Sequence, residues 1–166
     1  QELFWAGDFG SDYIQRRKTE EFLASNLSFF SQCLKKTSGI QTCIEFGSNI
    51  GINLNAIKLI LPHIKQYAIE INSKAVEVLK TQIPNENIIN SSILEFNPTR
   101  KWDLVLIKGV LIHINPEYLD SIYEKLVTSS SKYLLIAEYY NPTPIMVNYR
   151  GFDNKLFKRD FAGEML

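Results

Sequence analysis

The junction at residues 42–51, TCIEFGSNIG, constrains the fold more than any other part of the chain. An apolar strand pattern ends at the carboxylate Glu45, and the glycines Gly47 and Gly51 then lead into a helical pattern. Glycine allows the main chain to turn sharply and leaves room for a ligand pressed against the backbone. Asn49 occupies the position of a middle glycine, and asparagine tolerates positive φ. The junction therefore predicts a strand, a tight turn and a helix around a nucleotide-type cofactor, although a purely packing role gives the same pattern.

Short apolar runs alternate with helical patterns through most of the remaining chain. This alternation predicts parallel β-α-β units with right-handed crossovers and helices on both faces of the sheet. We therefore expect an α/β fold with a Rossmann-like, doubly wound, mostly parallel sheet, whose ligands bind beyond the carboxyl ends of the strands. The expected elements are a helix at 19–36, strands at 42–46, 66–71, 87–90, 103–107 and 132–138, helices at 51–61, 73–81 and 116–128, a loop at 141–150 and a helix at 154–165.

Composition limits the kinds of partner. Eighteen basic and eighteen acidic residues leave no net charge, which argues against a broad nucleic-acid or anionic-membrane surface and favours a small-molecule substrate. Cys33 and Cys43 lack metal-ligand spacing, so no metal site is expected. The apolar runs are too short to span a bilayer and no leader pattern opens the chain, so we expect a cytoplasmic protein. Whether it is a monomer or a homo-oligomer stays open.

The charge of Glu45 narrows the choice of cofactor. It lies two residues before Gly47, at the strand end where a ligand is expected. A carboxylate there repels the pyrophosphate of a dinucleotide and attracts a ligand that carries an ammonium and a sulfonium group. S-adenosylmethionine has both groups, and S-adenosylhomocysteine is its product after methyl transfer.

Polar residues at the next two strand ends extend the predicted cofactor site. Glu70 closes the apolar run YAIEI, where a carboxylate can accept both hydroxyls of a ribose. Ile71 follows it directly. Ser92 and Ile93 follow the third strand and offer a polar group and an apolar side chain to an adenine ring. A solvated strand end for Glu70, and a simple turn for Ser92, are the alternatives.

The fourth and fifth strands end in further candidates. Lys108 and His113 follow WDLVLI, and Glu138 and Tyr139 follow the last strand. His113 is the first candidate for a general base and Glu138 the second, and Lys108 is counted with the cofactor residues. A hydrogen-bonded structural histidine and a solvated carboxylate at a strand end are the alternatives.

The first residues, FWAGDFGSDY at 4–13, are rich in aromatics and glycine. This composition suits a lid that closes over a ligand, with Asp12 and Tyr13 as its contacts. An N-terminal arm packed permanently on the core has the same composition.

These residues together resemble class I S-adenosylmethionine-dependent methyltransferases. More narrowly, FWAGDFGSDYIQRR, IEFGSNIGINL, KGVLIHI and NYRGFDNKLFKRDFAGEML look like the methylases associated with pseudaminic acid biosynthesis. The resemblance implies that Glu45 and the backbone of Gly47, Ser48, Asn49 and Gly51 face the methionine part of the cofactor. It places Glu70 at the ribose, Ser92 with Ile93 at the adenine, and Tyr13 in the lid.

The resemblance also implies an acceptor and a division of the chain. The acceptor would be a sugar or sugar nucleotide of nonulosonate metabolism. From their placement at the rim of the sheet, we expect Tyr139, Tyr149 and Arg150 to shape the acceptor pocket, and Arg150 to pair with a phosphate or carboxylate of the substrate. Residues 1–40 would form a lid and helix, 41–138 the cofactor-binding core, and 139–166 the acceptor side of a single domain.

Two features depart from this family pattern. Ser92 stands where many relatives carry an acidic residue. Class I methyltransferases normally finish with a β-hairpin that adds an antiparallel strand to the sheet, and no such hairpin is expected before Leu166. Either a further segment supplies it, which we expect because RDFAGEML resembles a helix that leads into another strand, or a sheet edge is exposed.

Two other functions fit parts of the same pattern. A non-catalytic protein that binds S-adenosylmethionine or S-adenosylhomocysteine would keep the same pocket. An NAD-dependent enzyme on a related sheet is disfavoured by Glu45 and by the lack of a G-x-G-x-x-G sequence.

Overall fold

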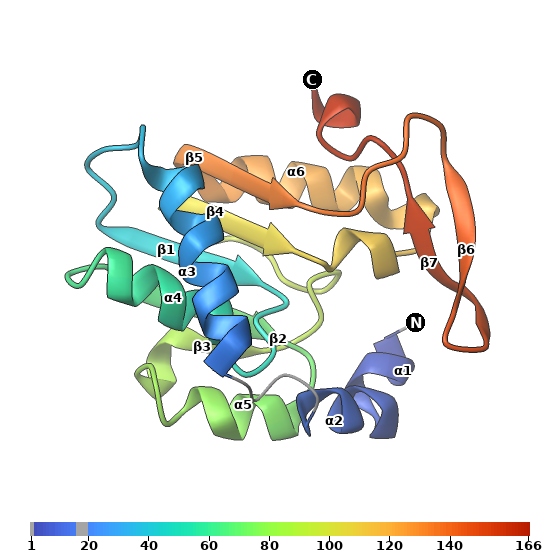
Figure 1. The fold of residues 1–166 in the computed structure, drawn as a ribbon, viewed down its shortest axis with the longest axis horizontal. Helices are drawn as coiled ribbons and strands as arrows, with labels where there is room; N and C mark the ends of the chain where they lie inside the picture. The colour runs from blue at the N-terminus through green and yellow to red at the C-terminus, as the bar shows by residue number, and fades with distance from the viewer. Residues whose placement is uncertain (1, 16–19) are drawn as a thin grey trace.

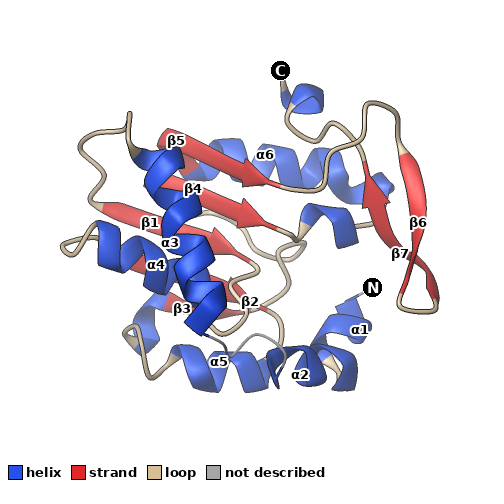
Figure 2. Cartoon of the chain, in the orientation of Figure 1, coloured by secondary structure: helices blue, strands red, loops and turns tan. Residues whose placement is uncertain are grey.

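The computed structural model describes residues 2–15 and 20–166, without the side chains of residues 13–15 and 20. Its centre is a five-stranded sheet in the order β3-β2-β1-β4-β5, in which every neighbouring pair is parallel (Figures 1 and 2). The expected Rossmann-like α/β fold is therefore confirmed. The strands are β1 (Thr42–Phe46), β2 (Lys65–Glu70), β3 (Ile88–Asn90), β4 (Trp102–Lys108) and β5 (Ser130–Ala137).

Side chains that alternate along the central strands pack into two separate apolar cores, one on each face of the sheet. From β1, Ile44 and Phe46 pack with residues of α6 (Leu119–Ser129) on one face. Cys43 points to the other face, where it packs with α3 (Glu20–Leu34) and α4 (Ile52–Ile60). Strands covered on both faces must be apolar throughout, which explains their continuous apolar runs.

The remaining elements of the core agree closely with the expected ones. The helix expected at 73–81 is α5 (Ser73–Leu79), which Asn72 caps by accepting from the N–H groups of Lys74 and Ala75. The helix expected at 116–128 begins as a 3₁₀ turn at Pro116–Tyr118 before α6. Of the expected 19–36 helix, Thr19 lies outside the described residues.

The last third of the chain corrects two predictions. The expected loop at 141–150 contains β6 (Ile145–Tyr149), and the expected helix at 154–165 is instead β7 (Phe152–Lys158) followed by a short 3₁₀ turn. The strands are antiparallel and joined by Arg150 and Gly151, with φ of 54° and 86°. Positive φ at both central residues is typical of the tight turns that join hairpin strands, and this turn overrides the helical spacing.

The hairpin does not join the five-stranded sheet, which ends at β5 within the part of the chain that the structure describes. Among the described residues, no antiparallel strand is added to the large sheet, and the C-terminal hairpin forms a separate two-stranded sheet. Instead the hairpin stands beyond the carboxyl ends of the strands (Figure 1).

The N-terminal helices, α1 (Glu2–Ala6) and α2 (Asp8–Gln15), lie at the same end of the sheet as the hairpin (Figure 1). The rings of Phe4 and Phe152 are 5.2 Å apart, and those of Phe9 and Tyr149 are 6.0 Å apart. The segment expected to form a lid or a packed N-terminal arm is therefore helical, and it packs against the hairpin. In residues 2–15 and 20–166, none of the helices has the length and apolarity that a bilayer crossing requires.

Candidate functional site

A cavity of about 700 Å³ lies at the carboxyl ends of the strands. The N-terminal helices and β7 contribute to its wall, so the cavity is bounded by the sheet, the lid region and the hairpin. The predicted site residues that line it are Gly47, Ser48, Asn49, Glu70, Ile71, Ser92, Ile93, Lys108 and His113. Glu45, Gly51, Glu138, Tyr139, Tyr149 and Arg150 do not line it, and the side chain of Tyr13 is outside the described part.

The glycine-rich loop at residues 47–51 turns from β1 into α4. The N–H groups of Gly47 and Ser48 both donate to the carbonyl of Ile69, at 2.9 and 3.0 Å. Gly47, Asn49 and Gly51 have φ of 77°, 48° and 81°. The predicted tolerance of Asn49 for positive φ is thus used, and the loop keeps its tight turn without a middle glycine.

Gly47→Ala is expected to destabilise this loop by about 1–3 kcal/mol. A Cβ on Gly47 would lie 2.6 Å from Cγ2 of Val110, and its φ of 77° is strained for alanine. Urea unfolding of Gly47→Ala measures the loss. Adding Val110→Ala removes the clash but not the strain, so it should recover only part of the stability; full recovery would contradict the strain argument.

Glu70 faces the cavity and also stabilises its wall. Its Oε2 accepts from the N–H of Asn49 at 2.7 Å, and its Oε1 accepts from the N–H of Asn72 at 2.8 Å. Burial raises the pKa of this carboxyl, and the backbone N–H groups partly oppose that rise. Each oxygen keeps a further lone pair, so Glu70 can still accept from ligand hydroxyls.

Glu45 is fully buried behind the wall rather than on it. Its Oε1 accepts from Nδ2 of Asn53 at 2.6 Å, and Oδ1 of Asn53 accepts from Nδ2 of Asn26 at 2.9 Å. Asn53 itself lines the cavity. A ligand in the cavity would therefore contact the amide of Asn53 rather than the Glu45 carboxylate itself.

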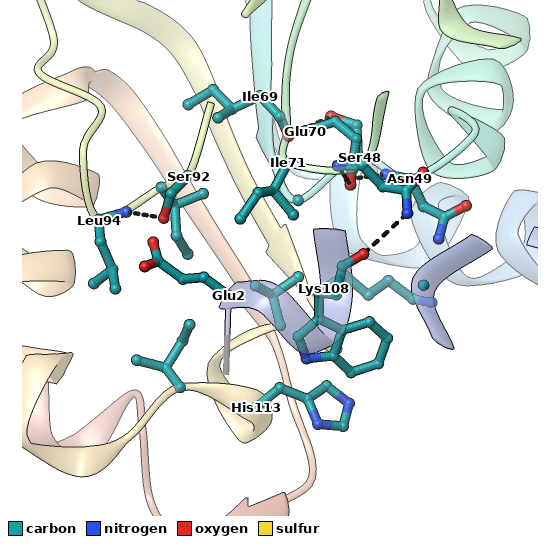
Figure 3. A pocket seen from close by; sticks show the side chains of 18 of the residues that line it. Glu2, Ser48, Asn49, Ile69, Glu70, Ile71, Ser92, Leu94, Lys108 and His113 are labelled. Carbon is teal, nitrogen blue, oxygen red and sulfur yellow. Dashed lines mark hydrogen bonds between the residues drawn. The ribbon is translucent and has the colours of Figure 1, made fainter. Parts of the chain in front are cut away.

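Ser92 and Ile93 lie on the wall that follows β3, and both are buried. Oγ of Ser92 accepts from the N–H of Leu94 at 3.1 Å, as the dashed line in Figure 3 shows. The Ser92 hydroxyl thus holds the local turn, and its proton remains a donor for a second partner. Lys108 lines the opposite part of the cavity, with Nζ 5.9 Å from the ring centre of Phe29.

Glu138 accepts hydrogen bonds from the main chain of the turn that leads to His113. Its Oε1 accepts from the N–H groups of Val110 and Leu111 at 2.9 and 3.0 Å, and Oε2 accepts from that of Ile112 at 3.5 Å. Burial raises the pKa of this carboxyl to about 7, although these N–H groups act to lower it. The carboxylate is engaged by the main chain and sits behind the cavity wall.

His113 is buried and reaches the cavity from the opposite side to Glu70 and Ser92 (Figure 3). Its Nδ1 lies 2.6 Å from the carbonyl oxygen of Lys155 on β7. A carbonyl oxygen only accepts, so Nδ1 carries the proton and a neutral ring has its acceptor at Nε2. The rings of Trp5 and Tyr149 lie 4.6 and 4.9 Å from the imidazole and fix its plane.

The three residues predicted to bind the methyl acceptor, Tyr139, Tyr149 and Arg150, do not line the cavity. Tyr149 packs on His113, whereas Tyr139 is 61% exposed. Arg150 is exposed in the hairpin turn, with its guanidinium 5.7 Å from the ring centre of Tyr149. The structure therefore brings only Tyr149 of the three to the His113 side of the site.

Several cavity residues were missed in the sequence. They come from the N-terminal helices, the first turn of α4, the residue that caps α5, the turns after β4, and β7: Glu2, Trp5, Gly10, Asn53, Asn72, Asn115, Tyr118, Asn154, Lys155 and Phe157. Asn72 carried a usable signal, because an asparagine directly before a helix pattern and two residues after Glu70 predicts a cap at the cofactor edge. Those on β7 and on the N-terminal helices depend on elements that the sequence did not predict as a hairpin and as helices.

The described residues include no group of three or more His, Cys, Asp or Glu side chains placed to hold a metal ion. No protein-family model matches the chain, and no curated protein matches it.

Solved structures of methyltransferases share the fold. The plantazolicin methyltransferase BpumL in complex with S-adenosylhomocysteine matches with a TM-score of 0.61 and 20% identity, over 84% of this chain and 57% of that one. An O-methyltransferase from a trans-AT PKS multienzyme of Brevibacillus brevis, also with S-adenosylhomocysteine, matches with a TM-score of 0.63 and 16% identity, over 96% and 54%. The sugar N-methyltransferase KedS8 from Streptoalloteichus gives 0.64 and 12%, over 88% and 62%.

These TM-scores show a shared class I methyltransferase fold, and the chain spans less than two thirds of the length of each of the three proteins. The likeness to class I methyltransferases expected from the sequence is thus confirmed at the level of the fold. Nothing in the three matches points to the methylases of pseudaminic acid biosynthesis in particular.

Proposed function

We propose that this protein transfers a methyl group from S-adenosylmethionine to a small-molecule acceptor. The observation that carries the proposal is the cavity at the carboxyl ends of the strands, where the glycine-rich loop, Glu70 and Ser92 line one wall and His113 lines another. Two structures with this fold hold S-adenosylhomocysteine. The arrangement supports a cofactor site on the sheet side and an acceptor site between the sheet, the lid and the hairpin.

The residues present fit an adenosyl cofactor. A buried carboxylate held by two main-chain N–H groups, that of Glu70, suits ribose hydroxyls. Ile71 and Ile93 offer apolar surface and Ser92 a hydroxyl to a base. We assign the methionine part to the backbone at residues 47–49, to Lys108 and to Asn53, with Glu45 acting through Asn53.

In this proposal the chain's own residues contribute orientation, proton removal and exclusion of water. The bound cofactor supplies an electrophilic methyl group. His113, with its proton fixed on Nδ1 by the Lys155 carbonyl, accepts the acceptor's proton at Nε2. Glu138 positions His113 by holding the main chain at residues 110–112. Trp5 and Tyr149 keep the imidazole in place.

For the acceptor we propose a sugar or sugar nucleotide of nonulosonate metabolism. The support is the resemblance of the terminal sequence motifs to that methylase family, together with one neighbour in fold that is a sugar N-methyltransferase. The polar side chains of Asn115, Asn154 and Lys155 on the His113 side of the cavity suit a hydroxyl-rich acceptor.

Calorimetry with S-adenosylhomocysteine and with NAD tests the cofactor class. We expect S-adenosylhomocysteine to bind with micromolar or better affinity and NAD to show no binding. Incubation with labelled S-adenosylmethionine and pools of sugar nucleotides, followed by mass analysis, then tests turnover. Binding without a methylated product in any extract would favour a non-catalytic binding protein, and NAD binding alone would overturn the proposal.

A further inference from the structure

Asn72 joins the cofactor wall to the N-terminal helices. Its side chain is buried, with 3% exposed, and both of its polar atoms are used. Oδ1 caps α5 by accepting from Lys74 and Ala75. Nδ2 lies 3.0 Å from the carbonyl oxygen of Trp5 and 3.3 and 3.4 Å from those of Ala6 and Gly7. One amide group therefore stabilises α5 and also binds the end of α1.

The main chain of Asn72 contacts the predicted ribose site at the same time. Its N–H donates to Oε1 of Glu70, whose Oε2 accepts from Asn49 in the glycine-rich loop. Trp5, which Asn72 holds by its carbonyl, packs on His113. Two hydrogen bonds and one ring contact thus connect the wall at Glu70 with His113 on the other side of the cavity.

Gly10 of α2 lies at the same joint, the contact between the N-terminal helices and Asn72. A Cβ at Gly10 would lie 1.9 Å from the carbonyl oxygen of Trp5 and 2.9 Å from Nδ2 of Asn72. No residue larger than glycine fits while the N-terminal helices stay against Asn72. Gly10 also lines the cavity, so the joint forms part of its wall.

We propose that Asn72 is a positioning residue that locks the N-terminal helices as a wall of the cavity and couples their closure to the Glu70 side of the cofactor site. This inference rests on the proposed function for the identity of the ligand. A ligand held by Glu70 favours the arrangement in which Asn72 also holds Trp5. Closure in turn slows release of the ligand and places Trp5 against His113.

Asn72→Asp tests the lock. Aspartate caps a helix as well as asparagine does, so α5 should persist. The Nδ2 donor is lost, and a carboxylate oxygen instead faces three carbonyl oxygens, with the Ser11 hydroxyl 3.4 Å away as its one possible donor among these four contacts. We expect exchange of the Ser11 amide proton, which is bonded to the Gly7 carbonyl, to accelerate at least tenfold. We expect S-adenosylhomocysteine to bind about tenfold more weakly, mainly through faster dissociation.

Asn90→Asp is the matched control. It introduces the same charge at the same sheet edge and removes an amide donor to the Glu70 carbonyl at 2.8 Å, yet in the described part of the chain its side-chain hydrogen bonds go to Ser73, Glu70 and Ile71 and not to the N-terminal helices. We expect its exchange rates at residues 2–12 to equal those of the wild type. Gly10→Ala is a second variant that should separate the N-terminal helices from Asn72, and it leaves the α5 cap unaltered. If Asn72→Asp does not fold, Gly10→Ala tests the proposal by itself.

The results separate this inference from the proposed function. Faster exchange together with weaker binding in Asn72→Asp or Gly10→Ala supports the lock. Unchanged exchange, or faster exchange with unchanged affinity, overturns the coupling even when the wild type binds S-adenosylhomocysteine. A wild type that ignores S-adenosylhomocysteine refutes the proposed function and with it the coupling to this ligand, whereas the exchange rates still report whether Asn72 holds the helices.

Discussion

Replacing His113 with alanine is expected to slow methyl transfer on the order of 10²-fold or more, as the loss of a general base does in other enzymes. The imidazole is the buried cavity group whose Nδ1 proton is fixed by the Lys155 carbonyl, which leaves Nε2 to accept a proton. Single-turnover rates with the identified acceptor measure the effect. Affinity for S-adenosylhomocysteine should change far less, because Glu70 and the glycine-rich loop are untouched.

His63→Ala is the control for this prediction. His63 is the other histidine of the two in the sequence, and it is exposed, away from the cavity. Its replacement should leave the rate unchanged. A His113→Ala protein that binds cofactor normally and transfers methyl at the wild-type rate would exclude His113 as the base.

The second large effect is a loss of stability with rising pH that depends on Glu138. Burial raises the pKa of this half-buried carboxyl from 4.5 to about 7 in the folded protein. A raised pKa means that the folded state holds the proton more tightly. Its stabilising contribution is therefore complete below pH 4.5 and is lost as the pH rises through 7. The loss amounts to about 3 kcal/mol, from 1.36 kcal/mol for each unit.

Urea unfolding between pH 4.5 and 8 checks this prediction in the wild type and in Glu138→Gln. The glutamine keeps an acceptor for the main-chain N–H groups but does not titrate. The difference in unfolding free energy between the two proteins should therefore shift by about 3 kcal/mol, in the direction of lower wild-type stability at high pH. Glu124→Gln, at an exposed position on α6, should run parallel to the wild type. Parallel curves for Glu138→Gln as well would refute the assignment.

The sequence was sufficient for the sheet and for much of the cavity wall that the strand ends form. Apolar runs buried on both faces have few alternatives to parallel strands, and residues at their carboxyl ends, such as Glu70 and Ser92, must meet at one edge. The positive φ of Asn49 followed from the same junction. These features depend on local sequence and on the rule that relates strand ends to ligand sites.

The positions of Glu45 and of the hairpin required tertiary information. Glu45 alternates along β1 with Ile44 and Phe46, so its side chain points to the face of α3 and α4. There it accepts a hydrogen bond from Asn53. The sequence alone did not show that a side chain on this face of the sheet lies outside the cavity. In the hairpin, the turn at Arg150 and Gly151 outweighed a helical spacing at 154–165.

The separation of β6 and β7 from the five-stranded sheet has a consequence for how such proteins diverge. The hairpin contacts the rest of the site through the Lys155 carbonyl on His113 and through ring contacts with Phe4 and Phe9. Within residues 2–15 and 20–166 it shares no strand pairing with the five-stranded sheet. Substitutions on its cavity side, at Asn154 or Phe157, alter the surroundings of a substrate without disturbing Glu70 or the glycine-rich loop. Under the proposed function, a new substrate preference could arise by mutation of one short hairpin, while selection on cofactor binding stayed unchanged.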